Sequence, residues 1–245
     1  MSHHPVGIVV ALAAEAKALA RKSLPAGQAI ALDNGDLAWL SGMGQQAARQ
    51  AAEGLISAGA TALAAFGVAG ALAPGLRSGT LFCPSCIIDE RGHDYVPTPA
   101  WRMALIQHLR ATALPMLTEG HLLSLPSPLL CAGDKAAMRE HHLAAAVDME
   151  SAAVAAVASE HRMPFVVLRA IVDERNDDIP TELQAGVDAW GRPLLWRMAA
   201  TLLRHPSLLS QLPKLASRMN KATHALQAAA AAAGRGLGRN PVLPC

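Results

Sequence analysis

Apolar runs alternate along the chain with segments that have the composition of helices. The strand-like runs are VGIVVAL, LAWLSG, TALAAFGVAG, GTLFCPSCIID and PFVVLRAIVDE. The helix-like segments include AAEAKALARKS, QQAARQAAEGLISAG, AWRMALIQHLRAT, DKAAMREHHL and ESAAVAAVASEHR. Because the last strand-like run is apolar almost throughout, it is typical of a strand covered on both faces. This order predicts an α/β fold, a single three-layer domain whose central mixed sheet is flanked by helices.

Length and composition are compatible with this fold. A chain of 245 residues that is 52% hydrophobic can bury a full core, as one large domain or as two small ones, and we take one domain as the default. Few aromatic residues and many Ala, Gly and Leu residues indicate helices packed closely on the sheet. Four cysteines without disulfide-framework spacing favour a reducing interior, so we expect a cytoplasmic protein.

Two apolar segments invite a membrane interpretation, and neither fits it. The N-terminal run VGIVVALAAEA lacks a basic leader, and Glu15 and Lys17 close it early, so it does not predict export. The uncharged stretch 54–76 is long enough to span a bilayer. Its glycines and its proline are better explained by a buried strand that leads into a Gly-rich loop. We therefore expect no transmembrane helix.

Four carboxylates lie where apolar runs give way to a loop or helix, namely Glu15, Asp148, Glu150 and Asp173. In sheets of this kind, functional groups gather beyond the carboxyl ends of strands, so these acids can converge on one pocket. Each acid taken alone has a simpler explanation, because the N-terminus of a helix favours a negative charge. The four together predict a site.

The segments GIVVALAAEAKAL, SGMG, GVAGALAPGLRSG, AVDMESAAVA and VLRAIVDE follow one another along the chain. In this order they resemble the nucleoside phosphorylase superfamily, in particular its methylthioadenosine/S-adenosylhomocysteine nucleosidase branch, over about residues 6 to 200. VDMES and RAIVD are the most specific part of the resemblance. The wording of VDMES, the segment IIDERGHD and a basic tail make the chain most similar to the hopanoid-associated phosphorylases, which act on adenosylhopane.

The resemblance implies a role for each acid in cleavage of an adenine nucleoside. Glu150 matches the glutamate that accepts hydrogen bonds from the ribose 2′ and 3′ hydroxyls, and Met149 matches the methionine that packs against the sugar. Asp173 matches the aspartate that protonates, or hydrogen-bonds to, the purine N7 as the bond breaks. Glu15 matches the acid that orients the attacking water in the hydrolytic branch. Asp148 replaces a frequent glutamate, and we interpret it as structural.

Two loops complete the implied binding site. The resemblance implies that Ser41, Gly42 and Gly44 form a loop at the ribose or at the nucleophile. It implies that Ala69 and Gly70, in the segment GVAG, also bind the substrate. A loose dinucleotide pattern, GMGQQA, lacks the following acid, and a turn that merely packs explains it equally well. The pair in CPSC has no second pair, so we expect no metal.

The nucleophile stays open at the level of sequence. Hexameric phosphorylases carry a phosphate-binding arginine and serine where this chain has Ala65 and Val68, and Glu15 would repel a dianion. The residues therefore favour water, whereas the hopanoid subgroup implies phosphorolysis, with inorganic phosphate as a possible co-substrate and no other cofactor. Val172 replaces the serine that precedes the catalytic aspartate in nucleosidases, and the base-clamping loop is unrecognisable in LLSLPSPLLCAGDK.

Three functions are consistent with these residues. The leading one is cleavage of the N-glycosidic bond of an adenine nucleoside with a bulky hydrophobic 5′ group, adenosylhopane above all. A nucleosidase for methylthioadenosine or S-adenosylhomocysteine is the main alternative. A non-catalytic nucleoside-binding or membrane-associated protein is disfavoured, because Glu15, Glu150 and Asp173 are retained together. The resemblance also implies a homo-oligomer.

The charge pattern divides the chain at its C-terminal end. All 19 acidic residues lie at or before Asp188, whereas eight basic residues follow it. We divide the chain into a catalytic domain, 1–204, and a tail, 205–245. Apolar residues at 208, 212, 215, 219, 222 and 226 predict an amphipathic helix whose first turn includes Pro213. Its apolar stripe suits the inner face of an anionic membrane, or the protein's own body or a sister subunit.

The rest of the tail suggests little structure of its own. The low-complexity end, AAAAAAGRGLGRNPVLPC, is expected to fray. The tail has no aromatic residues for base stacking, so we expect no nucleic-acid partner.

Overall fold

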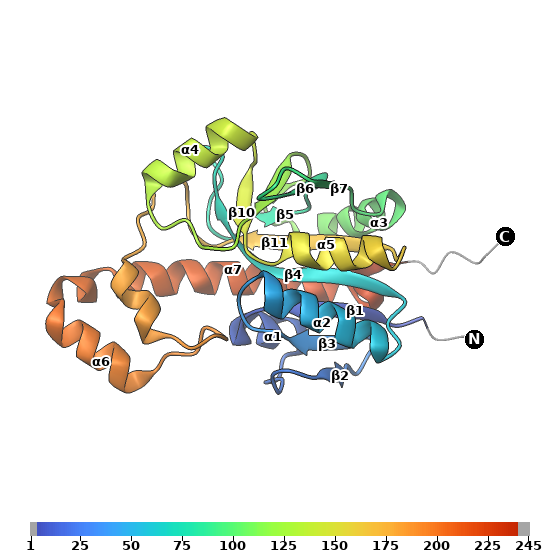
Figure 1. The fold of residues 1–245 in the computed structure, drawn as a ribbon, viewed down its shortest axis with the longest axis horizontal. Coiled ribbons are helices and arrows are strands. Elements are labelled where there is room, and N and C mark those ends of the chain that lie inside the picture. Colours follow the sequence, from blue (N-terminus) through green and yellow to red (C-terminus); the bar gives the residue numbers. More distant parts are fainter. Residues whose placement is uncertain (1–3, 240–245) are drawn as a thin grey trace.

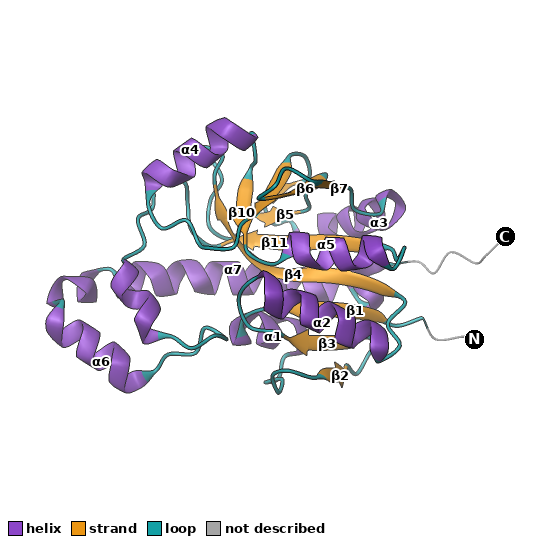
Figure 2. Ribbon diagram, viewed as in Figure 1, coloured by secondary structure: helices purple, strands orange, loops and turns teal. Residues whose placement is uncertain are grey.

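The computed structural model describes residues 4–239 and contains one mixed sheet with helices on both faces (Figure 1). Its strands are β1 (Val6–Val10), β2 (Ala29–Ala31), β3 (Leu37–Leu40), β4 (Ala62–Ala71), β5 (Leu81–Phe82), β6 (Cys86–Asp89), β7 (Asp94–Tyr95), β8 (Met116–Leu117), β9 (His121–Ser124), β10 (Ala146–Asp148) and β11 (Phe165–Ile171). Its helices are α1 (Ala13–Ala20), α2 (Gln45–Ser57), α3 (Pro99–Leu109), α4 (Ala132–His142), α5 (Ser151–Glu160), α6 (Leu195–Arg204) and α7 (Leu212–Ala233). Short 3₁₀ turns are η1 (Arg110–Thr112), η2 (Thr181–Gly186), η3 (Pro206–Ser210) and η4 (Arg235–Gly238). The predicted α/β fold class is confirmed (Figure 2).

The strand β4 organises the sheet because three other strands pair with it directly. It lies parallel to β1 and, along most of its length, to β11. Its last residues, Gly70 and Ala71, pair antiparallel with β10, from which the sheet continues through β9 and β6 to β7. The carboxyl ends of β1 and β11 therefore meet beside β4, and β10 runs back toward the same place. The residues that follow these strands share one region of the molecule.

Small side chains let the helices lie close to both faces of the sheet. On one face, α2 and α5 pack together over the alternate β4 residues Leu63 and Ala65. On the other face, α1, α3 and α7 cover Ala64 and Phe66. Alternation of this kind is expected of a strand buried on both sides. The close packing predicted from the alanine-rich composition is present in both layers.

The C-terminal helix α7 packs against the body of the protein. Pro213 lies in its first turn, as predicted. Along the predicted apolar stripe, Leu208, Ala222 and Leu226 are buried, and α7 contacts α1, α3 and β11. The stripe thus joins the same hydrophobic core as the first layer of helices, which is one of the environments expected for it.

The prediction that the chain frays after α7 is wrong for residues up to 239. Leu237 is only 1% exposed, and the Trp101 indole N–H donates to the carbonyl oxygens of Gly236 (3.1 Å) and Leu237 (3.0 Å). The backbone N–H of Gly236 donates to a carboxylate oxygen of the buried Asp36 (2.6 Å). The composition of this segment did not predict its order, because the residues that hold it, Trp101 and Asp36, lie far away in the sequence. The end of the predicted tail, residues 240–245, lies outside the described residues.

Two further features concern membranes. None of the helices within residues 4–239 has the length and hydropathy needed to cross a bilayer. The uncharged stretch 54–76 forms the end of α2, strand β4 and the loop after it, as the sequence predicted.

The segment formed by α6 and η3 projects from one side of the body (Figure 1).

Candidate active site

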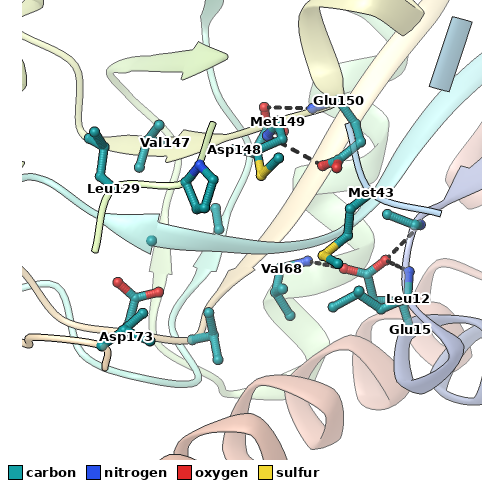
Figure 3. Close-up of a pocket in the computed structure, with 16 residues that line it drawn as sticks. Leu12, Glu15, Met43, Val68, Leu129, Val147, Asp148, Met149, Glu150 and Asp173 are labelled. Atoms are coloured by element: carbon teal, nitrogen blue, oxygen red, sulfur yellow. Dashed lines mark hydrogen bonds between the residues drawn. The ribbon is translucent and has the colours of Figure 1, made fainter. Parts of the chain in front are cut away.

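All four predicted acids line one pocket beside the middle of the sheet (Figure 3). Glu15 and Glu150 lie on one side of it, and Asp173 lies on the other. Met149, Ala69 and Gly70, which are predicted to bind the substrate, also line the pocket. The remaining walls are largely apolar and are formed by Ala11, Leu12, Met43, Val68, Pro128, Leu129, Val147, Val172 and Ile179.

Glu15 is buried in the first turn of α1 and is held by backbone N–H groups. One carboxylate oxygen accepts from Ala11 (2.8 Å) and Leu12 (2.9 Å), and the other accepts from Val68 on β4 (2.8 Å). Burial raises the pKa of Glu15, and the charge of Arg169 and these N–H groups oppose that rise only in part. The carboxyl group is thus fixed in place, and its affinity for a proton is higher than that of an exposed glutamate.

Gly67 provides the space in which Glu15 meets its counter-ion. A Cβ atom at this position would lie 2.4 Å from a carboxylate oxygen of Glu15 and 2.4 Å from a guanidinium nitrogen of Arg169. Any side chain would therefore displace one of the two groups. The glycine in AAFGVAG is explained by this close approach rather than by a turn.

Arg169 on β11 is the cation on which the acids of this side depend. Its side chain is 2% exposed. Its guanidinium lies 2.6 Å from a carboxylate oxygen of Asp148 and 3.8 Å from one of Glu150, and donates to the Ser151 hydroxyl (3.0 Å). The sequence analysis did not predict Arg169 as a site residue. It could have been identified, because it is the one charged residue inside the apolar run FVVLRAI.

Asp148 and Glu150 differ in their surroundings although they are two residues apart. Asp148 accepts from the hydroxyls of Ser124 (2.7 Å) and Ser151 (2.5 Å) and pairs with Arg169, which agrees with the structural role predicted for it. Glu150 accepts from the backbone N–H of Gly44 (2.8 Å). Burial raises the pKa of Glu150 to about 7; the negative charge of Asp148 adds to the rise, and Arg169 opposes it.

The SGMG loop places one residue in the pocket wall. The Ser41 hydroxyl donates to the carbonyl oxygens of Val10 (3.2 Å) and Gly42 (2.7 Å). Gly42 and Gly44 have φ values of +90° and +99°, which glycine adopts readily. Neither these glycines nor Ser41 belongs to the pocket wall; Met43 between them does. The glycines shape the turn that presents Met43.

Asp173 has a partner that the sequence did not reveal. Lys135 near the start of α4 is fully buried, and its ammonium group forms an ion pair with Oδ2 of Asp173. The same ammonium donates to the backbone carbonyls of Glu174 (3.2 Å) and Asp177 (3.0 Å). Lys135 lies in the polar segment DKAAMREHHL, which predicts an exposed helix, so no pattern identified it.

The loop after Asp173 is also bound to the C-terminal helix. The carboxylate of Asp177 is buried and pairs with Arg218 and with Lys214 (3.2 Å) of α7. Two basic residues of the predicted amphipathic helix thus hold the segment that carries Asp173. Across residues 4–239, no three His, Cys, Asp or Glu side chains are arranged to bind a metal ion.

Comparison with known proteins identifies the family. The family profile described as the phosphorylase superfamily matches residues 5–204. The chain belongs to the phosphorylase superfamily. The expected enzyme class, a nucleoside phosphorylase or nucleosidase that cleaves an N-glycosidic bond, is confirmed at this level. No curated protein sequence matches the chain significantly.

Solved structures show that this superfamily member shares its fold with nucleosidases. The 5′-methylthioadenosine/S-adenosylhomocysteine nucleosidase of Neisseria meningitidis, in complex with methylthio-immucillin-A, superposes with a TM-score of 0.70 at 18% identity, over 94% of this chain and 97% of that one. Futalosine hydrolase of Helicobacter pylori gives 0.66 at 16% identity, over 92% and 97%. A putative nucleosidase of the first kind from Francisella philomiragia gives 0.66 at 15% identity, over 94% and 96%.

Replacing Arg169 by methionine should destabilise the fold strongly. The variant leaves Asp148 buried without its counter-ion, so we expect a loss of about 3–5 kcal/mol in the free energy of unfolding, measured by urea denaturation. Arg49→Met is the matched control, because Arg49 forms an exposed pair with Glu160 (2.6 Å) worth at most about 1 kcal/mol. Similar losses in the two variants would contradict a central role for Arg169.

Proposed function

We propose that this enzyme hydrolyses the N-glycosidic bond of an adenine nucleoside that carries a bulky apolar 5′ group, with adenosylhopane as the favoured substrate. Water attacks C1′ of the ribose as the bond from C1′ to N9 breaks. The proton of the water passes to Glu15, and Asp173 relays a proton from solvent to N7 of the departing adenine. The products are adenine and the free sugar with its 5′ group.

The position of Glu15 is the observation that favours water over phosphate. Its carboxyl group already accepts the N–H of Val68, so this backbone donor is not free to bind an anion. The nearest cation, Arg169, is paired with Asp148. A phosphate dianion placed here would face Glu15 and Glu150 without a donor set of its own. A neutral water molecule meets no such repulsion, and the raised pKa of Glu15 suits a group that must take a proton.

The two sides of the pocket support different parts of the reaction. Glu150 and Met149 are proposed to hold the ribose, where a carboxylate can accept from both vicinal hydroxyls. Asp173 on the opposite side is proposed to bind the purine ring. This separation suits a transition state in which positive charge develops on the sugar, near Glu15 and Glu150, while the purine gains electron density.

The apolar walls support a hydrophobic 5′ substituent. Leu12, Met43, Leu129 and Ile179 line the pocket, and Met43 keeps 41% of its surface exposed. Methylthioadenosine and S-adenosylhomocysteine remain the alternative substrates, because the fold is shared with enzymes named for them. They differ from adenosylhopane in the amount of apolar surface that the 5′ group offers.

Release of adenine with and without phosphate tests the nucleophile. We expect the same rate in phosphate-free buffer, with free sugar as the product by mass spectrometry. Asp173→Asn and Glu15→Gln should each lower kcat about 10² to 10⁴-fold, because each removes a group that handles a proton. A phosphoribosyl product that depends on phosphate would replace hydrolysis by phosphorolysis. No release from any nucleoside would leave a non-catalytic binding protein.

A series of adenosine derivatives with lengthening 5′-alkyl groups tests the substrate class. Each enclosed methylene should raise kcat/KM about fourfold, which corresponds to about 0.8 kcal/mol. Met43→Glu should remove this increase, whereas Met103→Glu, at a site that is 67% exposed on α3, should retain it. A preference for methylthioadenosine over all longer groups would favour the alternative.

We also propose that the enzyme acts in the cytoplasm at the inner face of the membrane, where a lipid-linked nucleoside is found. The projecting segment exposes Leu203 (82%) and Leu209 (55%), and the exposed Arg204 follows Leu203 directly. Apolar tips with neighbouring cations suit an anionic surface. The homo-oligomer implied by the resemblance is part of this proposal and can be measured by sedimentation equilibrium.

Sedimentation with vesicles tests the membrane contact. The enzyme should bind vesicles that contain phosphatidylglycerol and release them at high salt, because the attraction is screened. Leu203→Asp with Leu209→Asp should abolish binding without changing hydrolysis of a short, water-soluble nucleoside. Equal binding by the wild-type and doubly substituted enzymes would contradict this surface.

A further inference from the structure

We propose that Lys135 is a positioning residue for the departure of the base, because it fixes one oxygen of Asp173 and leaves the other to the purine. This inference rests on the proposed function, in which Asp173 binds the ring. It assigns a role in the reaction to a residue on α4, a helix that lies behind Asp173 and contributes none of its described residues to the pocket wall.

The hydrogen bonds of Lys135 leave its ammonium group no freedom. An ammonium group has three N–H donors. Lys135 directs them to Oδ2 of Asp173 and to the carbonyl oxygens of Glu174 (3.2 Å) and Asp177 (3.0 Å). The side chain is completely buried, and a buried charge is stable only when it is paired and hydrogen-bonded. The three acceptors therefore fix the ammonium group in one place.

This arrangement makes the two oxygens of Asp173 different. Oδ2 is held by Lys135, whereas no hydrogen bond from the part of the chain that the structure describes reaches Oδ1. Asp173 lines the pocket beside Gly70, where a Cβ atom would lie 3.0 Å from Oδ2 and 3.2 Å from Oδ1, so the glycine leaves room for the whole carboxyl group. Rotation of the carboxyl group is opposed by Lys135, which holds Oδ2 in place. The group presents Oδ1 to a ligand in one orientation.

Lys135 also links Asp173 to the segment before α4, which forms part of the pocket wall. The N–H of Ile179 donates to the carbonyl of Leu130 (2.8 Å), and the N–H of Ala132 donates to Asp178 (2.8 Å). The segment before α4 supplies Pro128 and Leu129 to the pocket. The loop after Asp173 and the start of α4 therefore form one unit, and Lys135 is its only buried cation among the described residues. A base lying between them would be aligned with Oδ1.

Variants of Lys135 separate positioning from mere support of the fold. Lys135→Met keeps the volume and removes the charge, and we expect kcat per folded molecule to fall about 10²-fold with KM changed less than threefold. Lys135→Ala should lose as much and should regain at least tenfold with added ethylamine, which can occupy the vacated space. Lys221→Met, an exposed residue of α7, is the matched control and should keep full activity.

Binding of 9-deazaadenosine gives a second readout. This analogue carries hydrogen on the nitrogen that corresponds to N7, so it donates to the correctly oriented Asp173. Its advantage over 7-deazaadenosine, which lacks that nitrogen, should disappear in Lys135→Met and in Lys135→Gln. Lys135→Gln removes the charge but keeps an N–H donor, so it replaces the methionine variant in this experiment if that variant does not fold.

The outcomes distinguish this inference from the proposed function. An active wild-type enzyme with unchanged kcat and unchanged analogue preference in both variants would overturn the role of Lys135 alone. Lower stability with normal kcat per folded molecule would do the same, because it would show only structural support. A wild-type enzyme that releases no base and binds neither analogue would overturn both.

Discussion

On one side of the active site, a single buried cation among the described residues faces more negative charge than it can neutralise. Arg169 pairs with Asp148 and lies near Glu150 and Glu15, so only one positive charge offsets three carboxyl groups on this side of the pocket. Burial raises the pKa of Glu150 to about 7, and the neighbouring charge of Asp148 adds to this rise, while Arg169 and the backbone N–H of Gly44 oppose it. Such a site favours a neutral or positively charged partner and disfavours an anion.

The charge imbalance also gives the two ends of the pocket different properties. Near Glu15 and Glu150 the field is negative, whereas at Asp173 the negative charge is met directly by Lys135. In the proposed binding mode, a nucleoside that spans the pocket places its sugar in the first environment and its base in the second. The direction in which electrons move when a glycosidic bond breaks, from sugar to base, agrees with this difference.

The sequence predicted the parts of this site that follow from strand ends. Glu15, Glu150 and Asp173 each come directly after an apolar run, so the topology of an α/β sheet brings them together. Arg169 could have been identified in the same way, as a charge inside a buried strand. Lys135 and Met43 could not, because the polarity around Lys135 predicts exposure, and Met43 lies between the glycines of a turn. Their positions depend on tertiary contacts with segments far away in the chain.

The sequence likewise predicted the long elements of the fold but not the short strands or the ordered C-terminal end. Long strands and helices have a hydrophobic period that the sequence displays, whereas β7 and β8 have only two residues each and show none. The ordered end of the chain was missed because its stability comes from Trp101 and Asp36 rather than from its own composition.

Gly67 restricts how this site can change. Glu15 and Arg169 approach each other across its bare backbone, and one added methyl group would collide with both. Glu15 and Arg169 therefore cannot be adjusted separately through this position. A change at position 15 would alter the acid alone, but a substitution of Gly67 would disturb the acid and the support of Asp148 together. The glycine thus couples the chemistry of the enzyme to the integrity of its core.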